Sequence, residues 1–173
     1  MTTVSHSGID IFLHPGEWYF GDRHTRIQTT LGSCVAVTLW HSKLKLGGMC
    51  HYMLPGKEQP GATLNARYGH DALQLLMAEI GRQGTHPSNY EAKLFGGASM
   101  FETGPGGSSV ARRNIMAAEE LVQHHGLSVL ARSLGGSGYR QLVFDIATGD
   151  VWLRQGEGRT EEVQAGSVSG DVA

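Results

Sequence analysis

Residues 29–40 read TTLGSCVAVTLW, an apolar run with the composition of a buried strand that follows directly on Gly32 and Ser33. Valine, alanine, leucine and tryptophan after Cys34 favour burial in a sheet. The glycine and serine before it indicate a bend at which the backbone approaches another group closely. Cys34 is therefore either a small core residue or a nucleophile at the mouth of a strand. The local pattern alone favours the core residue, because free cysteines are among the most buried side chains.

The segments around Cys34 predict a β-hairpin. Residues 26–41 and 44–56 both have strand composition, and a short polar turn near residues 41–43 joins them. Paired strands lie about 4.8 Å apart, so His51 on the second strand can reach Cys34 on the first. The hairpin thus predicts a Cys–His pair, although His51 equally fits a core histidine bonded to a carbonyl. Cys50 and His51 alternate to opposite faces, so only one of them can face Cys34.

The rest of the chain alternates between helix and strand patterns. Apolar residues at helical spacing predict helices over 70–84 and 108–126, both closed by glycine. A strand at 90–101 runs into a glycine bend, and three strands follow at 127–134, 141–149 and 150–156. This order predicts an α/β or α+β sandwich, one sheet system flanked by two helices. We expect one domain over residues 1–156 and a polar, frayed tail over 157–173.

Composition narrows the classes of protein and partner. The 173 residues are 40% hydrophobic and 17% charged, with 14 Lys and Arg against 16 Asp and Glu, which is typical of a globular domain without the basic footprint of nucleic-acid binding. Residues 1–20 lack the charged leader and apolar core of a signal peptide, and no run approaches the roughly 18 apolar residues of a membrane span. We therefore expect a cytoplasmic protein without membrane insertion, whose two cysteines are thiols.

A metal site is the alternative to a catalytic Cys–His pair. Cys34, Cys50, His51 and His70 are ligand types, but they lack CxxC or HxxxH spacing. Adjacent strand residues also diverge, so we predict no metal site.

Five ordered segments within residues 27–154 are together specific: TTLGSCVAVTLW, GGMCHYMLPG, KLFGGASMF, ARRN and GGSGYRQLVFDIATGDVWLR. In these segments the chain resembles the bacterial chemotaxis family CheD, the chemoreceptor glutamine deamidases. The resemblance implies a cysteine amidohydrolase that converts selected receptor glutamines to glutamate with ammonia release and no cofactor. It also implies a three-layer α/β sandwich of mixed β-sheets with two main helices, similar to toxin-type glutamine deamidases.

The resemblance implies roles for individual residues. Cys34 matches the nucleophile and His51 its general base and acid. The family's third catalytic residue is a threonine a few positions before the cysteine. The best-matched spacing falls on Gln28, with Thr29 and Thr30 directly after it; we take Thr29, since a one-residue bulge can shift the match. Backbone amides then hold the oxyanion or the substrate, and the candidate positions for them are Gly32, Ser33, Gly97 and Ser99.

Two other functions stay open at this point. The resemblance implies a partner, the CheY-phosphatase CheC, so the chain is alternatively a regulatory binding module with Met100 and Phe101 as anchors, although both fit a core equally well. Attack by the Cys34 thiolate on a carboxamide would give a thioester that water opens, and the same chemistry would also serve a methylesterase acting on receptor glutamyl esters. Specificity for particular receptor glutamines is expected in the loops over residues 56–69 and 102–109.

Overall fold

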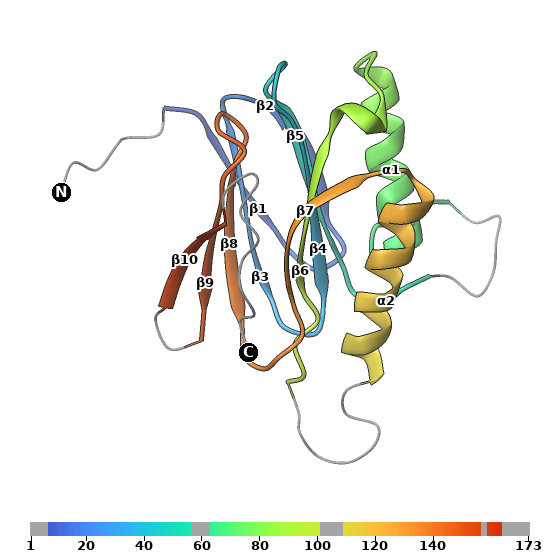
Figure 1. Ribbon diagram of the computed structural model, residues 1–173, viewed down its shortest axis with the longest axis vertical. Coiled ribbons are helices and arrows are strands. Elements are labelled where there is room, and N and C mark those ends of the chain that lie inside the picture. The colour runs from blue at the N-terminus through green and yellow to red at the C-terminus, as the bar shows by residue number, and fades with distance from the viewer. Residues whose placement is uncertain (1–6, 57–62, 101–108, 157–158, 164–173) are drawn as a thin grey trace.

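The computed structural model describes residues 7–56, 63–100, 109–156 and 159–163 (Figure 1). These residues form ten strands, two α-helices and one turn of 3₁₀-helix. In chain order they are β1 (Ile9–Leu13), β2 (Trp18–Asp22), β3 (Thr25–Leu31), β4 (Val35–His41), β5 (Leu46–Tyr52), α1 (Gly69–Arg82), η1 (Pro87–Asn89), β6 (Glu91–Gly96), α2 (Ser109–His124), β7 (Ser128–Leu134), β8 (Arg140–Asp145), β9 (Val151–Gln155) and β10 (Arg159–Val163).

The strands form two mixed sheets that stack as layers. Sheet A has the order β1-β3-β8-β9-β10, and sheet B has the order β2-β5-β4-β6-β7. Each sheet contains one parallel pair, β1 with β3 and β6 with β7, among antiparallel ones. Figure 1 shows sheet A on one side, sheet B in the middle and both helices on the far face of sheet B. The predicted three-layer α/β sandwich with two helices is confirmed.

Sheet B is the central layer, and it is buried on both faces. One core lies between the sheets and joins side chains such as Ile27 and Phe144 of sheet A to Met49 and Phe95 of sheet B. A second core lies between sheet B and the helices. Every residue of β4 is buried, because its alternate side chains supply both cores. This explains its continuous apolar sequence.

The segment that was predicted as one strand over 26–41 is two strands in different sheets. The chain leaves sheet A at Leu31 and enters sheet B at Val35. Residues 32–34 make this crossing as a bend. The hairpin prediction is confirmed in its second half, where β4 pairs with β5 and Ala36 lies opposite His51. Cys34 therefore lies in a corner between the two sheets.

Three strands lie outside the sequence predictions. β1 and β2 form from residues 9–22, and β10 pairs with β9. Because β10 covers residues 159–163, regular structure continues past residue 156 into the region that was expected to fray. The remainder of the predicted tail, residues 157–158 and 164–173, lies outside the described residues.

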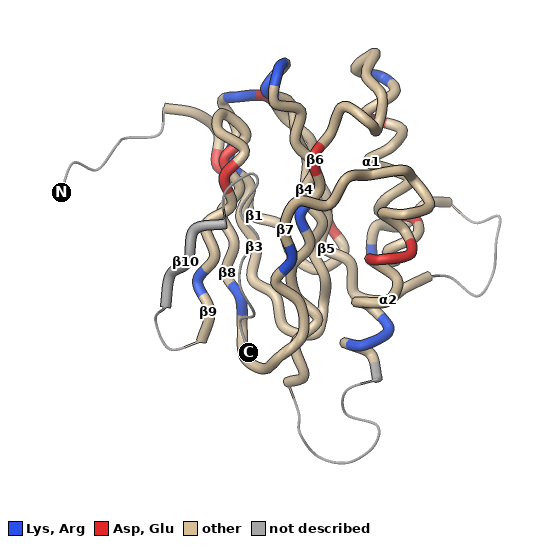
Figure 2. Tube along the Cα trace, viewed as in Figure 1, with Lys and Arg blue, Asp and Glu red and all other residues tan. Residues whose placement is uncertain are grey.

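Neither helix in the described part of the chain is long and apolar enough to cross a membrane. Lys and Arg positions are distributed over both sheets and both helices, with acidic positions among them (Figure 2).

Candidate active site

Cys34 lies at the corner where the chain passes from sheet A to sheet B. Its side chain is partly exposed and packs against the core between the two sheets. Ala36, two residues further, lies opposite His51 on β5. Cys34 packs on the same core between the sheets as Ala36, and the His51 side chain reaches across that interface to Thr29, so both side chains lie on the face of sheet B that meets sheet A. Cys34 and His51 share no hydrogen bond, since His51 Nε2 has no partner among the described residues.

The His51 side chain crosses the interface and meets Thr29 of β3 in the opposite sheet. Its Nδ1 lies 2.7 Å from Thr29 Oγ1, and both residues are buried, with exposed fractions of 1% each. Thr30 is exposed, and alternation directs Gln28 to the same outer face of sheet A. Of the three candidates for the third site residue, the structure brings Thr29 to His51.

The partners of Thr29 determine which ring nitrogen of His51 carries the proton. The hydroxyl of Thr29 donates its only proton to the carbonyl oxygen of Leu13, 2.8 Å away. The same oxygen can then only accept from His51, so Nδ1 carries the proton and Nε2 is the basic nitrogen. Nε2 is buried and has no hydrogen-bond partner among the described residues. The arrangement thus leaves the imidazole with an unused lone pair on Nε2, on the side of sheet B on which Cys34 packs.

Burial keeps both Cys34 and His51 neutral. Desolvation lowers the pKa of His51 to about 4; the carboxylate of Glu17 opposes this shift, and His14 adds to it. Burial also raises the pKa of the Cys34 thiol. The resting pair near neutral pH is consequently a thiol and a neutral imidazole, not a thiolate and an imidazolium.

Hydrogen bonds to its backbone carbonyls fix the bend at residues 32–34. The three consecutive carbonyls of residues 32–34 each accept one hydrogen bond. Their donors are Ala98 N (2.9 Å), Asn114 Nδ2 (3.0 Å) and Gly97 N (2.8 Å), in that order. A trans peptide points its N–H away from its carbonyl, so the amides of Ser33 and Cys34 face away from these donors. Neither amide has a partner in the described part of the chain.

Gly97 and Ser99 were predicted to hold the oxyanion or the substrate, and their amides are already engaged. Gly97 N–H donates to the Cys34 carbonyl, and Ser99 N–H donates to the Gly136 carbonyl. Gly97 therefore supports the backbone of Cys34. Gly96 precedes it with φ 112°, and a side chain there would overlap the carbonyl oxygen of Cys34. The bend was predicted in the right place, but its amides point to the protein backbone.

A buried arginine holds this glycine bend. Arg140 has an exposed fraction of 0%, and its guanidinium donates to the carbonyls of Gly96 (3.3 Å) and Gly135 (2.6 Å) and to Ser133 Oγ (3.1 Å). Gly135 N–H donates to the same Gly96 carbonyl. Residues 135–140 (GGSGYR) thus pack against the bend at Gly96 and Gly97, which binds the Cys34 carbonyl.

Cys50 lies on the other face of sheet B. It is buried in the core against the helices, with Tyr52 and Leu76, and both cysteines are free thiols. The alternation that was expected for Cys50 and His51 is therefore confirmed, and the two cysteines are separated by the sheet. No group of three His, Cys, Asp or Glu side chains that could hold a metal ion occurs within the described residues.

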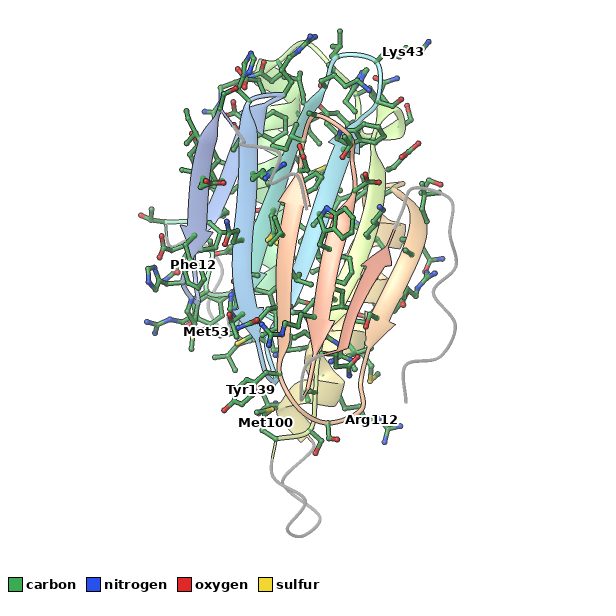
Figure 3. The ribbon with its side chains drawn as sticks, turned by 90° about the vertical axis from the view of Figure 1, so that its left-hand side faces the viewer. Phe12, Lys43, Met53, Met100, Arg112 and Tyr139 are labelled. Carbon is green, nitrogen blue, oxygen red and sulfur yellow. The ribbon has the colours of Figure 1, made fainter. Side chains whose placement is uncertain are left out.

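Several apolar side chains lie toward one end of the sandwich. Figure 3 shows Met53, Met100 and Tyr139 toward this end together with Arg112, Phe12 farther along one edge, and Lys43 at the opposite end. Phe12 and Tyr139 have exposed fractions of 51% and 61%, and Met100 packs against Gly32. Of the two loops predicted to carry specificity, residues 57–62 of the first and 102–108 of the second lie outside the described residues, and so does Phe101.

Sequence reasoning missed Asn114 on α2, which binds the backbone on both sides of the site. Its Nδ2 donates to the carbonyls of Ser33 and Met53. The signal was present in the helix pattern, because Asn114 is a polar residue on the same helical face as buried Ala111, Ala118 and Leu121. A buried polar side chain on an apolar stripe needs partners.

Comparison with known proteins adds the family context. A family model described as "CheD chemotactic sensory transduction" matches residues 53–155. The "Probable chemoreceptor glutamine deamidase CheD 3" of Dechloromonas aromatica is 44% identical over 158 residues, which cover 90% of this chain and 92% of that protein. The corresponding "CheD 1" of Chromobacterium violaceum is 46% identical over 87% of this chain and 80% of that protein. The relative from Pseudomonas savastanoi pv. phaseolicola is 43% identical over 84% of each.

Proposed function

This chain belongs to the CheD family, and we propose that it is a chemoreceptor glutamine deamidase, which hydrolyses glutamine side chains of chemoreceptors to glutamate and releases ammonia. The resemblance of its sequence motifs to this family is confirmed by the relatives and the family model. Those relatives are named as probable chemoreceptor glutamine deamidases. The structural observation that carries the proposal is the Thr29–His51 contact, which leaves His51 Nε2 unprotonated on the side of sheet B on which Cys34 packs.

The proposed reaction begins with proton transfer from Cys34 Sγ to His51 Nε2 as the sulfur attacks the carboxamide carbon of the glutamine. The imidazolium then gives this proton to the amide nitrogen, the C–N bond breaks, and ammonia leaves a thioester on Cys34. Water, deprotonated by His51, attacks the thioester carbon. The C–S bond breaks, the glutamate side chain is released, and the proton on His51 returns to the sulfur. Thr29 keeps the imidazole in its reactive orientation throughout.

The oxyanion of each tetrahedral intermediate needs hydrogen-bond donors. The amides of Ser33 and Cys34 are proposed for this role, because their peptide carbonyls are fixed and the amides themselves have no described partner. Gly32 allows the backbone to turn at this point beneath Met100. Gly97 serves the same site indirectly, through the carbonyl of Cys34. Ser99 holds the backbone near Gly136, so its contribution is to the shape of the bend.

The test is ammonia release from a purified receptor fragment that contains glutamine at its modification sites. We expect release by the wild-type protein and none by Cys34→Ala or His51→Ala, with thermal unfolding showing that both variants fold. Ammonia release by folded Cys34→Ala would refute the proposal. Methanol release from a methyl-esterified fragment, without ammonia release from the glutamine form, would assign the esterase activity instead.

A CheC-type phosphatase is the partner that the sequence resemblance implies, and we propose that it binds over the exposed Tyr139 and Phe12 side chains. Both supply exposed apolar surface, Tyr139 at the end of the sandwich that also carries Met100 and Phe12 farther along one edge. Capture of such a phosphatase by Cys34→Ala, and its loss in Tyr139→Ser, would support this binding as separate from catalysis. Binding that is unchanged in Tyr139→Ser and Phe12→Ser would exclude this surface. The expected cytoplasmic location belongs to the same proposal.

A further inference from the structure

Asn114 joins the two backbone segments that carry the reacting side chains. It lies on α2 with an exposed fraction of 0%. One proton of its carboxamide nitrogen goes to the carbonyl of Ser33, 3.0 Å away, and the other to the carbonyl of Met53, 2.9 Å away. Ser33 directly precedes Cys34, and Met53 follows His51 by two residues. A single nitrogen atom thus links the bend that contains Cys34 to the end of β5, the strand that carries His51.

The main chain of Asn114 is held in turn by sheet B. Tyr52, which directly follows His51, donates its hydroxyl proton to the backbone carbonyl of Asn114, with an O···O distance of 2.5 Å. Tyr52 is buried in the core between sheet B and the helices. The position of α2 over this end of the sheet is therefore fixed by the same strand that places His51.

The hydrogen bond to Ser33 also sets the direction of a catalytic donor. The Ser33 carbonyl and the Cys34 amide belong to one planar trans peptide, so fixing the first fixes the second. The carboxamide lies on the helix side of sheet B, whereas Cys34 and His51 point to the sheet A side. Asn114 consequently acts on the site through the backbone and does not touch the substrate.

We propose that Asn114 is a positioning residue for the deamidation, which sets the spacing of Cys34 and His51 and aims the Cys34 amide at the oxyanion. The inference rests on the proposed function for its kinetic part. Its acceptor atom, Oδ1, is buried without a partner among the described residues. Burying this oxygen without a partner lowers the stability of the fold. Both N–H groups of the same carboxamide are used in hydrogen bonds, so its function lies in these two N–H groups.

The test compares Asn114→Asp and Asn114→Ser with the wild-type protein. Aspartate has nearly the same shape, but it donates at most one proton, so at least one of the two backbone links is lost. We expect kcat to fall about 10- to 100-fold, as for a displaced reacting group or a lost oxyanion donor, with KM changed less than about threefold. The rate at which iodoacetamide alkylates Cys34 should change as well, because the spacing to His51 changes.

Trp40→Phe is the matched control. Trp40 Nε1 donates to the buried carbonyl of Ile146, 2.8 Å away, at the other end of β4. Its loss removes a buried side-chain-to-backbone bond of the same kind without touching the site. We expect a lowered melting temperature and kcat within twofold of wild type. A kcat within twofold in Asn114→Asp, or an equal loss of kcat in Trp40→Phe, would overturn the inference.

Two further readouts keep the inference and the proposed function separable. If the wild-type protein releases no ammonia, the proposed function fails, and the alkylation rates of wild type and Asn114→Asp still test the positioning of Cys34. If neither Asn114 variant folds, solvent exchange is measured in the wild-type protein. Both Nδ2 protons of Asn114 should then exchange at least about 100-fold more slowly than those of an exposed asparagine, and exchange at the exposed rate would overturn the inference.

Discussion

Replacing Thr29 by valine tests the assignment of the His51 tautomer. Valine has almost the same shape as threonine, so the substitution removes the hydroxyl and little else. Two buried hydrogen bonds are lost, from His51 Nδ1 to the hydroxyl (2.7 Å) and from the hydroxyl to the Leu13 carbonyl (2.8 Å). Each net bond contributes about 0.5–1.5 kcal/mol, and a buried group left without a partner costs about 1–3 kcal/mol. We expect the free energy of unfolding to fall by about 2–3 kcal/mol.

Thr29→Val should lower kcat by more than the loss of folding stability alone would cause. In the proposed reaction His51 becomes an imidazolium as Cys34 attacks, and hydrogen bonds to charged groups contribute about 1.5–3 kcal/mol. Losing that interaction at Nδ1 raises the barrier by the same amount, which lowers kcat by about 10- to 150-fold. KM should stay nearly constant, because Thr29 is only 1% exposed and does not face the substrate.

Ammonia release from the receptor fragment measures both constants, and two variants serve as controls. Thr29→Ser keeps the hydroxyl and should stay within about threefold of wild-type kcat. Thr30→Val alters the exposed neighbour and should leave kcat unchanged. Nitrogen-15 chemical shifts of the His51 ring report directly whether Nδ1 carries the proton. Full kcat in Thr29→Val, or a ring protonated at Nε2 in the wild-type protein, would refute the reasoning.

Three further predictions concern charge and backbone. Because burial raises the pKa of Cys34, its alkylation by iodoacetamide should be less than about 1% as fast at pH 6 as at pH 9; nearly equal rates would mean a preformed ion pair. The pKa of His51 is about 4 when folded and about 6.5 when unfolded, so its contribution is complete above pH 6.5 and lost as the pH falls to 4. Denaturant unfolding at pH 7 and pH 4 should then show about 3 kcal/mol more loss in wild type than in His51→Gln, and an equal loss would contradict the shift. Gly96→Ala would place a side chain on the Cys34 carbonyl and should lower kcat at least about 10-fold. Gly84 also has a positive φ, but a side chain there would meet no neighbouring atom, so Gly84→Ala should change stability only. Equal kcat in both variants would argue against the role of the bend.

Periodicity predicted the elements that bury one clear face. The helical spacing of Leu73, Leu76 and Ile80 corresponds to α1, and all three residues are buried in the core between sheet B and the helices. The hairpin of β4 and β5 followed from two apolar runs and a polar turn. β1 was missed because it is an edge strand of sheet A, and Ile9 and Phe12 on it are about half exposed, so no alternation is visible.

The site was only partly accessible from the sequence, because it depends on contacts between sheets. Strand alternation placed His51 away from Cys50, and that needs no tertiary information. The choice among residues 28–30 requires the packing of sheet A on sheet B, since only that packing brings Thr29 to His51. The engagement of the Gly97 amide likewise depends on the path of residues 32–34 between the sheets. A bend signal in the sequence gives the location of a turn, not the direction of its amides.

The neutral state of the pair has a chemical consequence for selectivity. Desolvation disfavours the thiolate at Cys34 and the imidazolium at His51 alike, so separating charge in the empty site is costly. In the proposed reaction the negative charge moves on from sulfur to the carbonyl oxygen of the carboxamide, and the amides of Ser33 and Cys34, which have no partner among the described residues, are the donors proposed to receive it. The nucleophile is then activated mainly by a substrate that fits those donors. The partly exposed thiol at the corner of the sandwich should thereby react slowly with other electrophiles.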